Sequence, residues 1–304
     1  YGFYTQYFYS ADSSFVPIIY DRLHRYLHEV WKVDSKGIPK ERAGGWTWGD
    51  WGEEIDMGLL TTCWYYLALK AEREFAIQLG KQSDVSDINR MMERIEKEFD
   101  DRYWTGSCYR SPKYKGKTDD RSQAMAILSG LTSSDKYKIL LEVFKKEYHA
   151  SPYMEKYVLE ALFQMKSPDL ALQRMKNRYA KMLSYKECTT LFEGWGPGVD
   201  GFGGGTINHA WSGGPLTLLS QKVCGIDATS PGFRTFKVEP QLGALMEVSA
   251  TVPTSFGKID VSIVKKHSKL EIKIVVPQNT KAEVIFPNGK TSWLESGIHE
   301  LAGN

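Results

Sequence analysis

The chain has 304 residues, with 39 Lys and Arg against 37 Asp and Glu, which gives a net charge of +2. This near balance gives no reason to expect nucleic acid or an anionic membrane surface as a partner. The four cysteines are widely spaced, with no CxxC pair and no histidine at metal-binding spacing. We therefore expect free thiols, no zinc site and no cofactor.

The first two thirds of the chain predict helices. Apolar residues recur at spacings of three and four from Phe15 to Val30, and a later stretch that is apolar nearly all round ends at Gly80. Ser83 and Ser134 are expected to be N-caps, and short connections favour antiparallel helical hairpins. The predicted helices span residues 15–30, 54–79, 83–99, 119–131, 134–147, 152–165, 168–182 and 206–224.

The remainder of the chain predicts strands. After residues 229–232 the apolar pattern changes to period two, and turn residues separate the short runs. The predicted strands are 248–252, 258–264, 270–275 and 282–286. We therefore predict an α+β, multidomain chain, with a helical domain at 1–229 and an antiparallel β-sandwich at 230–304.

A glycine- and tryptophan-rich segment covers residues 44–54, Gly-Gly-Trp-Thr-Trp-Gly-Asp-Trp-Gly-Glu-Glu. Three Trp within six residues either fill a core or line a pocket, and sugars present flat apolar faces on which such rings pack. Asp50 is either the N-cap of the following helix or a polar group of that pocket. Glu53 and Glu54 are favoured at a helix start by its dipole.

A second glycine-rich segment runs through residues 189–214 and is expected to be a long loop, a kind of segment that is commonly functional. Glu193 lies beside Trp195, and a carboxylate in such a partly apolar setting suits proton transfer. His209 is either a hydrogen-bond donor to a sugar or to that carboxylate, or a structural residue that caps a helix.

Other reaction classes lack their motifs. The sequence has no GxSxG, no P-loop and no paired-histidine metal motif, and its six His are scattered. Residues 119–122, Asp-Asp-Arg-Ser, are interpreted as a helix start rather than a cation site. Metal-dependent catalysis is therefore not expected.

Four motifs together resemble the α-L-rhamnosidase family, with Phe192 standing where that family usually has Trp. They are residues 49–51, 189–195, 208–211 and 230–241. The resemblance implies an (α/α)6 helical toroid followed by a β-sandwich. It also implies an inverting glycoside hydrolase, in which a carboxylic acid and a carboxylate about 6.5–9.5 Å apart flank the glycosidic bond.

The resemblance also assigns roles to residues. Glu193 matches the catalytic base, Trp51 a sugar-packing aromatic, and His209 a residue that contacts the bound sugar. The other residues expected to bind substrate are Asp50, Trp48 and Trp195.

The family's general acid lies in an acidic, Arg-containing motif upstream of Gly-Asp-Trp, and this sequence has no match for it. Eight predicted helices also fall short of the twelve in a complete toroid. We therefore expect a fragment that lacks the acid, with further N-terminal domains in its parent protein.

Two alternatives stay open: a non-catalytic fragment that binds glycan, and another (α/α) toroid glycosidase or lyase. Because polysaccharide is met outside the cytoplasm, a periplasmic or secreted location is preferred.

Overall fold

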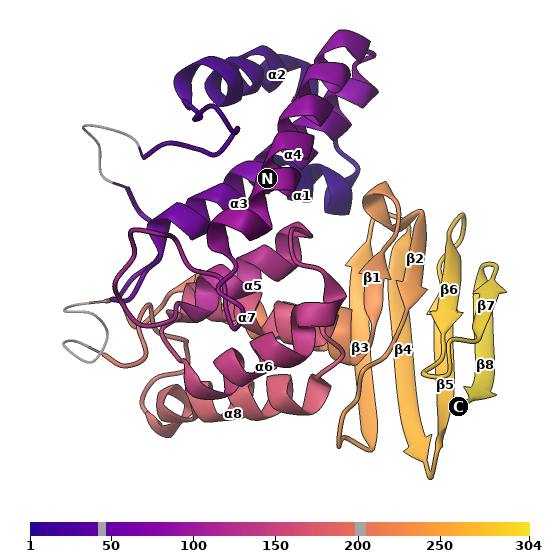
Figure 1. Cartoon of the computed structure of the whole chain (residues 1–304). Helices are drawn as coiled ribbons and strands as arrows, with labels where there is room; N and C mark the ends of the chain where they lie inside the picture. Colours follow the sequence, from indigo (N-terminus) through magenta and orange to yellow (C-terminus); the bar gives the residue numbers. More distant parts are fainter. Residues whose placement is uncertain (42–46, 198–204) are drawn as a thin grey trace. The chain divides into compact units, whose positions relative to one another are not determined.

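The computed structural model describes residues 1–41, 47–197 and 205–304. These residues form two compact units. The first contains Tyr1 and residues 13–165 and 181–212, and the second contains residues 2–12, 166–180 and 213–304. Helices dominate the first unit and strands the second, as the change of pattern along the sequence predicts (Figure 1).

The helical elements of the described residues follow the predicted order. They are α1 Gly2–Ser10, α2 Val16–Arg25, η1 Tyr26–Val30, α3 Met57–Gln78, α4 Gln82–Tyr103, α5 Asp120–Ser129, η2 Ser134–Lys136, α6 Tyr137–Lys146, α7 Pro152–Gln164, α8 Pro168–Ser184, η4 Ala210–Gly213, α9 Gly214–Leu218, η5 Leu219–Val223 and η6 Pro231–Phe233. Within the described residues, no helix is long and apolar enough to span a membrane.

Several helix boundaries differ from the prediction. Lys81, not Ser83, precedes α4, and Ser133, not Ser134, precedes the short helix before α6. The single helix expected at 206–224 is a succession of short 3-10, α and π turns. The sequence analysis missed α1 because its run of aromatic residues has no helical apolar periodicity.

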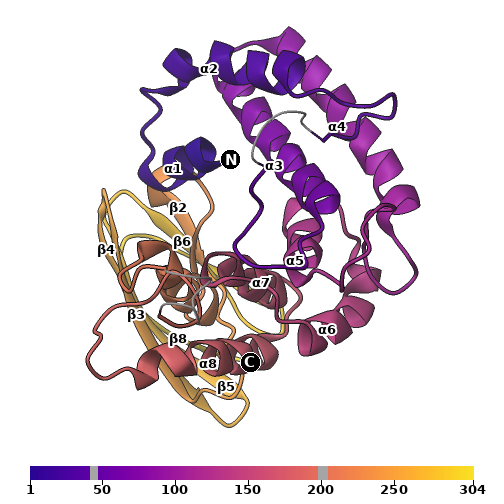
Figure 2. The same ribbon diagram turned by 90° about the vertical axis from the view of Figure 1, so that its left-hand side faces the viewer.

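The first unit is organised around α5. Helices α3 and α4 run side by side in both views, and α5 contacts both α3 and α7 (Figures 1 and 2). Almost every residue of α5 is buried, including the polar ones at its start. Asp119 and Arg121 are therefore held inside the helical core, where a charge needs a specific partner.

The strands of the second unit form two four-stranded sheets that share one apolar core. They are β1 Ile226–Ala228, β2 Thr235–Val238, β3 Glu247–Thr254, β4 Gly257–Lys266, β5 Lys269–Val276, β6 Lys281–Ile285, β7 Thr291–Leu294 and β8 Gly297–Gly303. Side chains alternate between the two faces of a strand, so apolar residues at every second position make one face buried. On that face, Val261 and Ile263 of β4 pair with Ile274 and Ile272 of β5.

The order is β1-β2-β6-β7 in one sheet and β3-β4-β5-β8 in the other. The prediction of an antiparallel sandwich was wrong at one pair, because β2 and β6 are parallel. A parallel pair needs a long crossover, and three strands of the other sheet, β3, β4 and β5, supply it.

Helix α1 belongs to the second unit. The Tyr9 hydroxyl donates to Asp227 Oδ1 at 3.0 Å and accepts from Gln221 Nε2 at 2.8 Å. The Tyr9 ring lies 5.8 Å from that of Phe233. The start of the chain therefore packs with residues more than 200 positions away.

Candidate active site

Asp50 anchors the tryptophan loop, by which we mean residues 47–56; Gly44, Gly45 and Trp46 lie outside the described residues. The side chain is only 4% exposed. Its Oδ2 accepts hydrogen bonds from Arg121 Nη1 at 3.1 Å and from the Ser151 N–H at 2.9 Å, and its Oδ1 accepts one from the Ser151 hydroxyl. The N-cap of α3 is instead Asp56, whose side chain accepts from Leu59 N at 3.2 Å.

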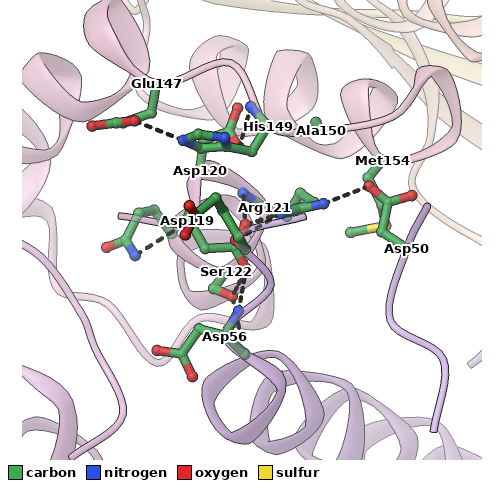
Figure 3. A network of polar contacts seen from close by, with 12 residues as sticks. Asp50, Asp56, Asp119, Asp120, Arg121, Ser122, Glu147, His149, Ala150 and Met154 are labelled. Atoms are coloured by element: carbon green, nitrogen blue, oxygen red, sulfur yellow. Dashed lines mark hydrogen bonds and ion pairs between the residues drawn. The ribbon is translucent and has the colours of Figure 1, made fainter. Parts of the chain in front are cut away.

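Arg121 is fully buried and lies between Asp119 and Asp50 (Figure 3), and it also holds the far end of the same loop. Its Nε donates to Asp119 Oδ1 at 2.6 Å, and its Nη2 donates to the carbonyl oxygens of Glu53 and Glu54 at 2.7 and 2.8 Å. Burial raises the pKa of Asp50, and the Arg121 charge and the Ser151 hydrogen bonds oppose that rise. The guanidinium fork thus fixes the loop from Asp50 to Glu54 by paired charge and backbone contacts.

Glu193 lies in a short backbone pairing. The Glu193 N–H donates to Thr206 O at 2.8 Å, and the His209 N–H donates to Leu191 O at 2.9 Å. Residues 191–193 and 206–209 are therefore held side by side, and residues 198–204 lie outside the described residues. The pairing brings Glu193 close to His209, as one of the two interpretations of His209 from the sequence requires.

The carboxylate of Glu193 is clamped on one side. Its Oε2 accepts from Thr206 N at 3.0 Å and lies 3.8 Å from His209 Nδ1. His209 Nδ1 also lies 2.7 Å from the Thr206 hydroxyl. The side chains of Glu193 and His209 are 19% and 29% exposed, so a ligand can reach both.

One turn, residues 149–151, connects the two loops. Ser151 donates to Asp50 of the tryptophan loop, and the carbonyl of Ala150 accepts from Trp195 Nε1 at 2.9 Å. The His149 N–H donates to Asp120 Oδ1 at 3.2 Å (Figure 3). This 149–151 turn therefore sets the position of the Asp50 loop and the Glu193 loop together.

Four rings form an aromatic wall: Trp48, Trp51, Tyr153 and Trp211. Trp48 stacks on Trp211 at 6.1 Å and 11°, and Trp51 meets Trp48 edge-on at 6.1 Å and 72°. The Tyr153 ring lies 5.6 Å from Trp48 and 5.1 Å from Trp211. The His209 ring lies 4.2 Å from Trp211, which connects the wall to the Glu193 clamp.

Two indole N–H groups of the aromatic wall are buried without a hydrogen-bond partner among the described residues. They are Nε1 of Trp48 and Nε1 of Trp211. Buried polar groups are usually paired, so two unpaired donors in a pair of stacked rings are unusual. Neither Trp211 nor Tyr153 was predicted as a site residue. Trp211 lies two positions after His209 and could have been named, whereas Tyr153 has no distinguishing sequence signal.

A cleft of about 850 Å³ opens beside Trp48. Its lining combines indole rings with charged groups: Trp31, Trp48, Trp64, Asp56, Arg102 and Lys113. Its size and mixed lining are typical of a site for a small ligand.

Two family models match the chain in succession. Residues 3–223 match the bacterial α-L-rhamnosidase six-hairpin glycosidase domain, and residues 225–298 match the bacterial α-L-rhamnosidase C-terminal domain. A curated α-L-rhamnosidase of Formosa agariphila is 22% identical over 254 residues, which cover 78% of this chain and 27% of that relative.

Solved structures show the same fold. The native α-L-rhamnosidase of Aspergillus terreus has a TM-score of 0.84 and 16% identity, covering 98% of this chain and 37% of that one. The α-L-rhamnosidase of Streptomyces avermitilis, complexed with L-rhamnose, has a TM-score of 0.79 and 18% identity, covering 98% and 32%.

The chain thus spans between about a quarter and two fifths of these relatives. The predicted fold class, a helical domain followed by a β domain, is confirmed. The family resemblance drawn from the four sequence motifs is also confirmed, since the two matched ranges together contain all four motifs. The chain belongs to the bacterial α-L-rhamnosidase family.

Proposed function

We propose that this chain forms the part of an inverting α-L-rhamnosidase site that holds the catalytic base. In this reaction Glu193 takes a proton from a water molecule, which attacks the anomeric carbon as the glycosidic bond breaks. A separate carboxylic acid gives its proton to the leaving oxygen. The product sugar then carries the opposite anomeric configuration.

The proposal rests on one observation, the continuous arrangement of Glu193, His209 and the aromatic wall. The Thr206 N–H donates to one oxygen of the carboxylate, His209 Nδ1 lies 3.8 Å from that oxygen, and the His209 ring lies 4.2 Å from Trp211. A sugar ring packs its apolar face on such indoles.

The predicted site residues then divide into two groups. We propose that Trp48, Trp51 and His209 contact the sugar, as the family resemblance implies. Asp50 and Trp195 have their polar atoms engaged by the 149–151 turn or by Arg121. We propose that they position the two loops; direct sugar contact by these two stays a prediction.

The general acid is proposed to come from outside these 304 residues. The chain alone is then expected to bind sugar with little turnover, and the native polypeptide that contains it to hydrolyse an aryl α-L-rhamnoside. The test is a panel of aryl glycosides and uronate polymers assayed with both proteins. Turnover of the α-L-rhamnoside alone supports the proposal.

Other results of this panel have distinct meanings. Cleavage of another glycoside or of a uronate polymer in preference would indicate a different toroid enzyme. Saturable sugar binding with no product from either protein would indicate a glycan-binding role. Both results contradict the proposed activity.

We also propose a periplasmic or secreted location, because the substrate class is met outside the cytoplasm. Fractionation of the source cells tests this directly. Recovery of the protein with cytoplasmic markers contradicts it.

A further inference from the structure

A cluster of two histidines and a glutamate lies in the first unit and takes no part in the proposed reaction. His24 lies near the end of α2, His28 lies one turn later in the π-helical segment η1, and Glu72 lies in α3. Nδ1 of His24 lies 2.7 Å from Glu72 Oε1, and Nε2 of His28 lies 3.0 and 3.1 Å from the two carboxylate oxygens. The two imidazole rings stack at 4.0 Å.

The carboxylate at the centre of the cluster is fully buried. Among the described residues, the two histidines are the hydrogen-bond partners of Glu72, and no lysine or arginine pairs with it. An ionised carboxylate removed from water is costly unless a positive charge compensates it. A divalent cation held between the three side chains would supply such a charge.

We propose that His24 Nδ1, His28 Nε2 and a Glu72 oxygen bind one divalent transition-metal ion of the zinc class. Their ligand atoms all lie within 4.8 Å of one another. Tetrahedral ligands at zinc distances are roughly 3.3 Å apart, so each ring nitrogen needs to move only a few tenths of an ångström away from Glu72 Oε1, from which it lies 2.7 or 3.0 Å. Two imidazoles and one carboxylate form a donor set that suits zinc.

Access to the cluster comes from the histidine side. The side chain of His24 is 34% exposed and that of His28 is 17% exposed, while Glu72 closes the site from within. A water molecule can thus complete the coordination from the solvent side. The ion cross-links residues 16–30 to α3, and a π-helical segment at this point fits a functional site.

This proposal departs from the expectation, drawn from the sequence, that the chain has no paired-histidine metal motif. The spacing His24-x-x-x-His28 places both rings on one helical face, and it was available in the sequence. The third ligand comes from 44 residues beyond His28, so only the fold brings it into place. The proposed ion is structural and is independent of the proposed hydrolysis.

The test is a zinc titration of the metal-stripped chain, prepared without a polyhistidine tag, by calorimetry. We expect one ion per chain, and cobalt in its place should give the strong visible absorption of tetrahedral coordination. His28→Gln should weaken binding by at least ~100-fold, the upper end of what loss of an outer-shell partner costs. The variant His267→Gln, an exposed histidine of the second unit, should bind as the unaltered chain does.

A folding defect is separated from lost ligation by a second variant and a second measurement. His24→Gln changes a partly exposed ring, and its metal-free form should keep the circular dichroism spectrum of the unaltered chain. Zinc should raise the melting temperature of the unaltered chain and not that of either variant. No zinc binding by the unaltered chain, or binding that survives in both variants, overturns the proposal.

Discussion

Arg121 is the residue on which the tryptophan loop depends. Its guanidinium is fully buried between Asp50 and Asp119 and also donates to two backbone carbonyls. Removing one partner of a buried ion pair is far more costly than never having had the pair, because the remaining charge stays buried. The network therefore supports the position of Trp48 and Trp51 through Asp50.

Asp50→Asn should lower the free energy of unfolding by about 3 kcal/mol, the low end of the range for a broken buried pair. The low end applies because Asp119 still pairs with Arg121. Urea-induced unfolding measures the change. The matched control is Asp21→Asn, since Asp21 is 86% exposed in its ion pair with Lys81 and should contribute little. Equal stability of the two variants would show that the buried pair does not hold the loop.

Among the secondary-structure elements and their connections, the 149–151 turn fixes loop positions as Arg121 does among the residues. It lies directly before α7, whose first turn it caps through the Ser151 hydroxyl, and it receives Trp195 Nε1 on the Ala150 carbonyl. Both candidate loops form hydrogen bonds with this turn, through Asp50 and Trp195. Loss of the Trp195 hydrogen bond should therefore loosen the Glu193 loop.

Trp195→Phe tests this connection by removing one N–H while keeping an aromatic ring. The Ala150 carbonyl then loses the hydrogen bond from Nε1, and a typical hydrogen bond contributes about 0.5–1.5 kcal/mol. We expect faster amide hydrogen exchange in residues 189–197 and a higher KM in the native polypeptide. Trp293→Phe, on an exposed ring of β7, should change neither. Unaltered exchange in the Trp195 variant would mean that the turn does not position this loop.

The sequence predicts regular elements well and the site only in part. Periodic stretches such as residues 57–78 and 269–276 fall close to their predicted bounds, because burial of one face decides both pattern and structure. Glu193 and His209 could be paired from motifs in one loop. The contact between Asp50 and Arg121 spans 71 residues, and no local pattern encodes it.

At the scale of the whole molecule, the second unit is assembled from three separate parts of the chain. One close backbone approach within it lies at Gly225, just before β1, where the Glu239 N–H donates to the Gly225 carbonyl at 3.0 Å. Gly225 has a φ of +85°, and an added Cβ would lie 2.3 Å from the Glu239 carbonyl carbon. The Glu239 backbone cannot move aside for an added Cβ as easily as a flexible side chain could.

Gly225→Ala should therefore lower the melting temperature more than Gly289→Ala. Gly289 has a nearly equal φ of +82°, but nothing lies within 4 Å of its added Cβ. Both variants incur the left-handed penalty of roughly 1–2 kcal/mol, and Gly225→Ala adds the clash. Differential scanning calorimetry compares them. Equal shifts would mean that this approach does not limit the stability of the second unit.

The central claim is that Glu193 is the base of a glycoside hydrolase site. Glu193→Gln keeps an oxygen to accept from Thr206 N but removes the basic carboxylate, and Glu187→Gln alters an exposed carboxylate in the same segment as a control. In the native polypeptide acting on an aryl α-L-rhamnoside, kcat should fall by roughly 10²–10⁴-fold for Glu193→Gln, with KM little changed. The control should keep the original rate. A Glu193→Gln variant that also keeps that rate would contradict the assignment.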